Sequence, residues 1–303
     1  MLFRSQPLVA TRLMITMSRA YAGLGLYERS QALARDALAI RQRLLAPDDP
    51  RIAEALHYVG VTQGELRQHA QALATLQEAL RLREAALGPD ALEVGETLYR
   101  ISFIEHRLGD YPAMGAALKR ALPIHEHALG ADSAATAEVR RMLGIYYYLV
   151  SDHAASLESL QRALLAIERI YGKDSIRVVD TLQALGRLQW QLGEFPQAIE
   201  LYSRALAIKE AYLGAEHPDL GPTLYGLAVS SKDLGALSEA GRYYDRVIAL
   251  QEKVLGPDDF YLALSLSGEG FLQLELGELD RARAAFTRSL AIAELYGDRK
   301  SVV

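Results

Sequence analysis

A period of 42 residues runs through the chain without insertion until its last few residues. One register of this period is apolar at every step: Leu38, Leu80, Leu122, Leu164, Leu206, Ile248 and Leu290. A second register holds only small residues: Ser18, Gly60, Ser102, Gly144, Gly186, Ala228 and Gly270. A third is mostly large: Ala34, Leu76, Leu118, Leu160, Tyr202, Tyr244 and Phe286. A fixed period with such a small/large pattern predicts a solenoid whose repeats pack on their neighbours.

Each repeat has the pattern of two helices. In the fifth, residues 178–192 carry apolar side chains at three- and four-residue spacing, which indicates an amphipathic helix. Gly193 follows, as a helix C-terminus favours. Pro196 then starts a second helix, where its missing N–H costs nothing. This helix continues to about Tyr212 and closes at Leu213-Gly214.

A further register is acidic throughout, and consists of Asp48, Asp90, Asp132, Asp174, Glu216 and Asp258. Carboxylates just before a helix favour its positive end and cap its N–H groups, so we interpret these residues as helix caps. A ladder of cation sites is the competing interpretation. No repeat, however, supplies the clustered oxygens that a hard cation needs.

The mid-helix glycines of the small register, Gly60, Gly144, Gly186 and Gly270, each cost about 1 kcal/mol relative to Ala. We expect them to let two helix backbones approach closely.

Composition excludes several classes of protein. The net charge is −5 with no basic block, which argues against nucleic acid as the main ligand. No apolar run is long enough to span a bilayer, and no convincing signal peptide precedes the repeats. The absence of cysteine removes disulfide and thiolate chemistry. We therefore expect a cytoplasmic protein without a membrane partner. Its Arg-rich, Asn-free composition suggests a GC-rich bacterial genome.

The two ends match translated sequencing-adapter sequence. We therefore expect residues 1–5 and 298–303 to be non-native, and residues 6–297 to be an internal piece of a longer bacterial protein. Within that piece the predicted repeats begin near residues 9, 51, 93, 135, 177, 219 and 261. An end cut in this way would expose apolar side chains such as Leu13, Met14 and Met17. Self-association through the array ends is one expectation that follows, as an artefact of the cut rather than a biological function.

The repeat resembles the 42-residue tetratricopeptide repeat of kinesin-light-chain-like proteins. In the fifth repeat the resemblance is carried by Leu182, Leu185, Gly186, Gly193, Phe195, Ala198, Tyr202, Ala205, Leu206 and the closing Leu213-Gly214-x-x-His217-Pro218. It covers nearly the whole chain. It implies an all-α fold, a right-handed α-solenoid of about seven helix hairpins, in which the first helix of each pair lines a concave groove.

Applied to this chain, the family pattern implies that a set of aromatic, cationic and polar residues faces that groove. They are Tyr99, Phe103, His106, Arg141, Tyr148, Gln183, Arg187, Trp190, Tyr225, Lys232 and Phe271. Trp, Tyr and Arg anchor interfaces because they bury a large area at little entropic cost. The competing interpretation is that some of these rings pack between adjacent first helices. The acidic Glu54, Glu96, Glu138 and Asp180 make the charge along the helices mixed.

These residues predict a scaffold that binds an extended or helical peptide of a partner protein between the third and sixth repeats. Apolar side chains would lie against the rings, and acidic ones would meet Arg141, Arg187 and Lys232. The resemblance also leaves open a regulatory or sensory module that acts in cis within a bacterial Ser/Thr kinase or transcription regulator. A chaperone-type carboxylate clamp would need asparagines, which the chain lacks.

No motif for catalysis stands out, since the chain has no phosphate-binding glycine loop, kinase catalytic loop or serine elbow. His125 and His127 form the only close histidine pair, and two residues apart on a helix they face different directions. We interpret all seven histidines as surface residues. Of Tyr146, Tyr147 and Tyr148, we expect at least one in the core and one toward a ligand. We expect no catalytic residue, no metal site and no cofactor.

Overall fold

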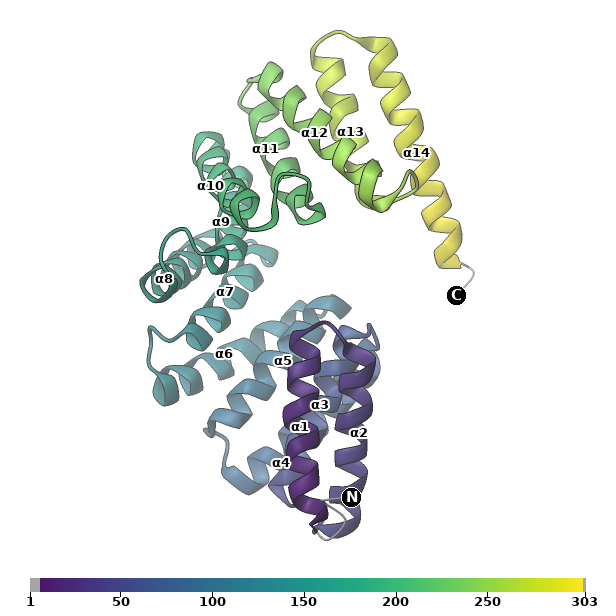
Figure 1. The fold of residues 1–303 in the computed structure, drawn as a ribbon. Coiled ribbons are helices and arrows are strands. Elements are labelled where there is room, and N and C mark those ends of the chain that lie inside the picture. The colour runs from purple at the N-terminus through teal and green to yellow at the C-terminus, as the bar shows by residue number, and fades with distance from the viewer. Residues whose placement is uncertain (1–5, 302–303) are drawn as a thin grey trace. The chain divides into compact units, whose positions relative to one another are not determined.

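The fold was analysed in a computed structural model that describes residues 6–301, with side chains described as far as Leu295. In these residues the secondary structure is helical, and the chain divides into two units, residues 1–152 and 153–303. Figure 1 shows the helices following one another as antiparallel neighbours within each unit. The all-α prediction is confirmed.

The first unit holds the helices of the first three repeats and the first helix of the fourth. They are α1 (Pro7–Gly23), α2 (Tyr27–Leu44), α3 (Pro50–Glu65), α4 (His69–Leu87), α5 (Leu92–Leu108), α6 (Tyr111–Leu129) and α7 (Ala134–Leu149). Each helix packs on the next along the chain, and α3 also touches α1 and α5. The core of this unit includes Leu76, Leu98, Met114, Leu118 and Met142, all nearly inaccessible to solvent.

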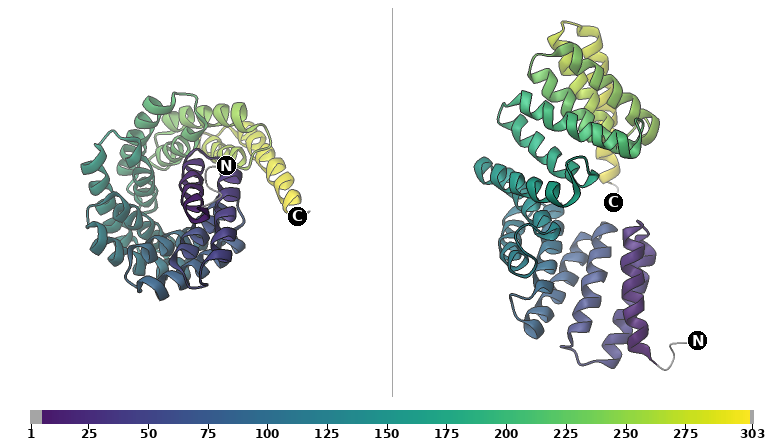
Figure 2. Two further views of the ribbon diagram at one scale, coloured as in Figure 1. Left: turned by 60° about the horizontal axis from the view of Figure 1, so that its bottom comes forward. Right: turned by 60° about the vertical axis from the view of Figure 1, so that its left-hand side comes forward.

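The second unit holds the remaining helices. They are α8 (His153–Tyr171), η1 (Ile176–Val178), α9 (Val179–Gln191), α10 (Phe195–Leu213), η2 (Pro218–Leu220), α11 (Gly221–Asp233), α12 (Leu237–Leu255), α13 (Phe260–Glu275) and α14 (Leu279–Ser301). Successive helices again pack on one another, and α11 also touches α9 and α13 (Figure 2). Tyr202, Leu224, Leu227 and Tyr244 lie in its core.

In the fifth repeat the helix boundaries differ slightly from those predicted. The first helix is preceded by one turn of 3₁₀-helix, so that Val178 ends η1 and Val179 begins α9. The second helix begins at Phe195, which places Pro196 at its second position. The predicted closure is confirmed, because α10 ends at Leu213 and Gly214 takes a φ of 89°. The repeat boundaries as a set remain our proposal, as does the non-native origin of the ends. Residues 1–5, 302 and 303 lie outside the described residues.

The small and large registers meet inside the hairpins. A Cβ on Gly60 would lie 2.6 Å from Leu76 Cγ, and one on Gly270 would lie 2.7 Å from the ring of Phe286. At Gly186 the ring of Tyr202 would be 3.0 Å away. At these positions the glycine makes room for the large side chain of the second helix, rather than chiefly for its backbone as predicted.

The acidic register does not supply the capping side chains, so that interpretation was wrong. The residue that caps lies one position later in the repeat. Asp49 accepts a hydrogen bond from the backbone N–H of Arg51, and Asp259 accepts one from that of Tyr261. Ser133 and Ser175 cap the corresponding turns with their hydroxyl groups. A side-chain oxygen must follow the turn immediately to reach these N–H groups, which explains the shift by one residue.

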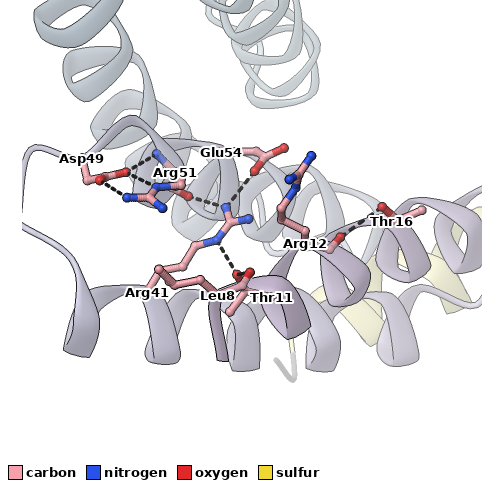
Figure 3. A network of polar contacts seen from close by, with 8 residues as sticks. All are labelled: Leu8, Thr11, Arg12, Thr16, Arg41, Asp49, Arg51 and Glu54. Carbon is pink, nitrogen blue, oxygen red and sulfur yellow. Dashed lines mark hydrogen bonds and ion pairs between the residues drawn. The ribbon is translucent and has the colours of Figure 1, made fainter. Parts of the chain in front are cut away.

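A buried polar residue near the end of the second helix ties consecutive repeats together. Arg41, Arg83 and Lys209 each donate a hydrogen bond to the backbone carbonyl ten residues later, in the first turn of the next repeat. Figure 3 shows Arg41, whose guanidinium also donates to Thr11 Oγ1 over 3.1 Å and to Glu54 Oε2 over 2.8 Å. Because the Arg41 side chain is buried, its hydrogen bonds to Thr11 and to the Arg51 carbonyl replace water that these groups would otherwise lose.

Candidate functional site

The predicted groove residues all lie on first helices of the repeats. In the first unit α5 carries Tyr99, Phe103 and His106, and α7 carries Arg141 and Tyr148. In the second unit α9 carries Gln183, Arg187 and Trp190, α11 carries Tyr225 and Lys232, and α13 carries Phe271. Arg187 and Phe271 are exposed, and the others are partly buried. This set is called the first-helix residues below.

On α5, three first-helix residues occupy successive turns. The rings of Tyr99 and Phe103 meet edge to face, with centroids 6.4 Å apart. The guanidinium of Arg100 lies over the Tyr99 ring at 5.6 Å. Burial raises the pKa of the Tyr99 hydroxyl above its usual value. A partly buried aromatic pair can offer a ring edge to a ligand and remain anchored in the core.

In the second unit, a polar chain joins the ends of α9, α11 and α13. Trp190 Nε1 donates to Asp233 Oδ2 over 2.6 Å, and Lys232 Nζ donates to Asp233 Oδ1 over 2.5 Å. Lys232 also reaches Glu275 at 3.3 Å. On the preceding turns, Gln183 donates to Thr223 Oγ1 over 2.7 Å. These bonds fix the indole and the ammonium group of neighbouring repeats in place.

Two of the three cations predicted to meet an acidic ligand are already paired. Arg141 donates to Glu138 Oε2 over 2.8 Å, and Lys232 binds the two carboxylates named above. A ligand carboxylate would have to compete with these partners. Arg187 is exposed and also interacts with other groups of the chain.

The tyrosine run on α7 is partly buried at all three positions, and Tyr146 and Tyr147 pack against the core of the first unit, as expected for at least one of the three. Tyr146 lies where a Cβ on Gly115 would come within 2.3 Å of its ring. The ammonium of Lys119 lies over the Tyr146 and Tyr147 rings, at 5.3 and 5.6 Å.

The interpretation of all histidines as surface residues was wrong for His57 and His125. His57 is 5% exposed and lies beside Arg83 and Thr97, and burial next to Arg83 lowers its pKa. His125 is 3% exposed, and its Nδ1 donates to the Ala121 carbonyl over 2.8 Å. Hydrogen bonds to nearby groups compensate this burial, which the sequence alone does not reveal.

A pocket of about 250 Å³ lies between α3, α4 and α5 of the first unit. Of the first-helix residues only Phe103 lines it, and its charged lining residues Arg67, Arg100 and Arg107 were not among those predicted. One signal in the sequence could have found it. Arg67 occupies a position that is glycine in five other repeats, namely Gly25, Gly109, Gly193, Gly235 and Gly277.

Across the described side chains, no group of three or more His, Asp or Glu residues is arranged to hold a metal ion. None of the described helices has the length and apolar character that a membrane crossing requires.

The architecture defines the class of protein: an α-solenoid built from repeated helix hairpins. The tetratricopeptide repeat model matches residues 10–85, 93–164, 147–211 and 219–294, so the chain belongs to the tetratricopeptide repeat family. No curated protein matches the sequence significantly.

Solved structures share the fold at low identity. BtubC (BKLC) from P. vanneervenii is 22% identical, with a TM-score of 0.63 over 76% of this chain and 92% of its own. The Rap conjugation gene regulator of plasmid pLS20, solved with the Phr* peptide, is 14% identical, with a TM-score of 0.64 over 97% and 77%. A STAND protein with a tetratricopeptide repeat sensor, PH0952 from Pyrococcus horikoshii, is 14% identical, with a TM-score of 0.71 over 94% and 43%.

Proposed function

We propose that this chain is a non-catalytic, cytoplasmic protein-interaction module whose first helices bind a peptide segment of a partner protein. The observation that carries the proposal is the recurrence of partly buried aromatic side chains on the first helices. Such rings occur on α5 and α7 in the first unit and on α9 and α11 in the second, and Phe271 on α13 is more exposed. Rigid aromatic side chains held in place by packing are typical anchors of interfaces.

The ligand chemistry follows from the surroundings of these rings. Apolar side chains of the peptide would lie against Phe103, Tyr148 and Trp190. Since Arg141 and Lys232 already bind carboxylates of their own chain, apolar contact contributes more to affinity than ion pairing does. Acidic groups of the peptide would meet Arg141, Arg187 and Lys232, the cations of the first-helix residues.

The solved structures support the class of function. The structure of the pLS20 Rap regulator is a complex with the Phr* peptide, so a chain of this fold holds a peptide. The low identity gives no information about which peptide this chain would take.

The test is capture of partners by residues 6–297 from a bacterial lysate, followed by mapping of the bound segment as synthetic peptides. The double variant Arg187→Ala/Trp190→Ala should lose the mapped peptide. Replacing Trp190 with Ala removes both the indole ring and the N–H group that donates to Asp233. The second variant, Trp190→Phe, removes the same donor but keeps most of the ring area. Circular dichroism should show an unchanged helical signal in all variants.

Arg162→Ala is the matched control, since Arg162 is an exposed arginine on α8 whose partner Glu158 is on the same helix. This variant should bind the mapped peptide as the parent does. Equal binding of the parent and the Arg187→Ala/Trp190→Ala variant would reject the first helices of the second unit as the binding surface.

A second candidate function is regulation in cis within a longer signalling protein. The structure of PH0952 favours it, because there a region of this fold makes up 43% of a longer STAND protein with a tetratricopeptide repeat sensor. The encoding locus decides between the candidates: a kinase or transcription-regulator domain in the same reading frame would establish the second.

Self-association is a further proposal and rests on α1. Val9, Leu13 and Met17 recur every four residues along this helix and are 42, 43 and 47% exposed, which makes one apolar face. Leu13→Lys should abolish any concentration-dependent dimer seen by light scattering.

A further inference from the structure

The pocket in the first unit combines an apolar lining with several cationic side chains. Val61, Leu76, Phe103 and Ile104 contribute apolar surface. Arg67, Arg100 and Arg107 contribute three guanidinium groups, and Glu65 contributes one carboxylate. Positive groups thus exceed negative ones by three to one. Such a lining suits a ligand that has an apolar body and an anionic group.

The three pocket arginines are exposed, whereas the buried and partly buried arginines of the unit are paired. Arg41, Arg83, Arg140 and Arg141 each pair with a glutamate. Among the residues that the structure describes, no carboxylate lies within ion-pair distance of the pocket arginines. Arg100 instead lies over the Tyr99 ring. Three guanidiniums without a carboxylate partner around one pocket are an unused capacity to bind an anion.

The backbone at Arg67 provides a second, independent observation. Arg67 has a φ of 60°, in the left-handed region where glycine is favoured, and it occupies the position that is glycine in five other repeats. An arginine costs conformational free energy there. Unfavourable backbone conformations that persist in a protein cluster at functional sites. The guanidinium that this residue brings to the pocket offers a reason for keeping it.

A third observation concerns His69, the first residue of α4, which also lines the pocket. Its Nδ1 atom is buried without a hydrogen-bond partner within the described part of the chain. The same atom of His153, two repeats later, is also buried without a partner, so this feature recurs at the start of the second helix.

From these observations we propose that the pocket binds an aryl phosphate, the group found on a phosphorylated tyrosine side chain. An engineered apolar cavity of about 150 Å³ holds a benzene molecule, so a pocket of about 250 Å³ has room for a ring and its phosphate. A phosphate monoester carries close to two negative charges at neutral pH and three acceptor oxygens, which match three guanidiniums better than a single carboxylate does.

Phe103 belongs both to this pocket and to the first-helix residues, so assigning the phosphate to a partner peptide rests on the proposed function. The proposal that the pocket binds an aryl phosphate does not rest on the proposed function. The probes are therefore small molecules and the substitutions are in the first unit, whereas the peptide test above changes Arg187 and Trp190 in the second. A failure of one can be distinguished from a failure of the other.

The experiment is a titration of residues 6–297 by ligand-detected NMR, with phenyl phosphate, benzoate and phenol as probes. Phenyl phosphate should bind most tightly, benzoate at least about tenfold more weakly, and phenol not measurably. Rising salt should weaken the binding of phenyl phosphate. A Gly-phosphotyrosine-Gly peptide distinguishes the two sources: tighter binding than phenyl phosphate assigns the ligand to a peptide, and weaker binding assigns it to a free small molecule.

Arg67→Gly is the decisive variant, because it removes a guanidinium and restores the residue that other repeats use. It should bind phenyl phosphate at least about tenfold more weakly without a lower melting temperature. Arg100→Gln tests a second guanidinium, and Arg35→Gln, an exposed arginine on α2, is the control that should bind normally. The proposal is overturned if phenyl phosphate binds no tighter than benzoate, or if Arg67→Gly and Arg100→Gln both bind as the parent does.

Discussion

The same repeat position is filled differently in the two units. In the first, Arg41 and Arg83 each donate to a backbone carbonyl and a threonine hydroxyl, and each forms an ion pair with a glutamate. In the second, Lys209 donates to the Asp219 carbonyl, and Gln251 leaves its Oε1 buried without a partner in the described part of the structure. Other repeats place His125, Ile167 and Ala293 at this position, so the 42-residue period fixes neither a long polar side chain there nor how completely its hydrogen bonds are satisfied.

A second difference concerns the large register and the residue 24 positions later, which faces it across the next helix. In the third repeat, which lies in the first unit, this pair is Leu118 with Met142, both buried in one core. In the second unit it is Tyr202 with Gly226, and Tyr244 with Gly268, where a Cβ on the glycine would lie within 2.6 Å of the ring. The larger ring is accommodated by the loss of the facing side chain, so the summed volume changes less than either residue does.

The largest expected effect is a difference in stability between substitutions of Arg41 and Gln251, which occupy the same repeat position. Arg41→Met should destabilise the first unit by about 3 kcal/mol, because the Arg51 carbonyl and the Thr11 hydroxyl lose a buried donor. Gln251→Met should be neutral or slightly stabilising, because it removes an unsatisfied buried oxygen. Hydrogen exchange of the helices around each site measures both effects. Equal losses at the two positions would refute the contrast.

The second prediction exchanges the facing pairs. Gly226→Met should cost about 2 kcal/mol, since a Cβ there would meet the Tyr202 ring at 2.5 Å. Adding Tyr202→Leu recreates the Leu118/Met142 pair and should recover most of that loss. A double-mutant cycle from thermal unfolding gives the coupling energy. Additive losses of stability would show that the volumes of the two side chains are not coupled.

The third prediction uses the buried carboxyl group of Glu105 in the first unit. Burial beside Asp110 raises the pKa of Glu105 to about 7. Since the folded-state pKa lies above the unfolded value, the stability contribution is complete below about pH 4.5 and is lost as the pH rises through about 7. Glu105→Gln should therefore be more stable than the parent by about 1–2 kcal/mol at pH 8, and indistinguishable at pH 4. At the equivalent position of the second unit, Gln273→Glu should introduce the same pH dependence.

Residues that obey the period were predictable, and those that depart from it were not. The helix hairpins follow from a pattern repeated along the chain, and the closure at Leu213-Gly214 from one repeated in most copies, so each copy strengthens the inference. The burial of His57 depends on Arg83, which is 26 positions away and belongs to a different register. The pairing of Trp190 with Asp233 likewise joins two repeats. Such contacts depend on how neighbouring repeats meet, which no single repeat records.

The smallest expected effect tests the left-handed turns of the two units directly. Gly193 and Arg67 occupy the same repeat position with φ values of 80° and 60°. Gly193→Arg should cost about 1 kcal/mol although a Cβ there has room, since the cost is conformational. Arg67→Gly should leave stability unchanged or raise it by about 0.5 kcal/mol, because relief of the backbone is partly offset by the greater freedom of glycine in the unfolded chain.

Chemical denaturation of both variants and the parent measures these changes. If Arg67→Gly instead destabilises the first unit by more than about 1 kcal/mol, the arginine contributes to folding. Its retention at a glycine position would then need no ligand to explain it.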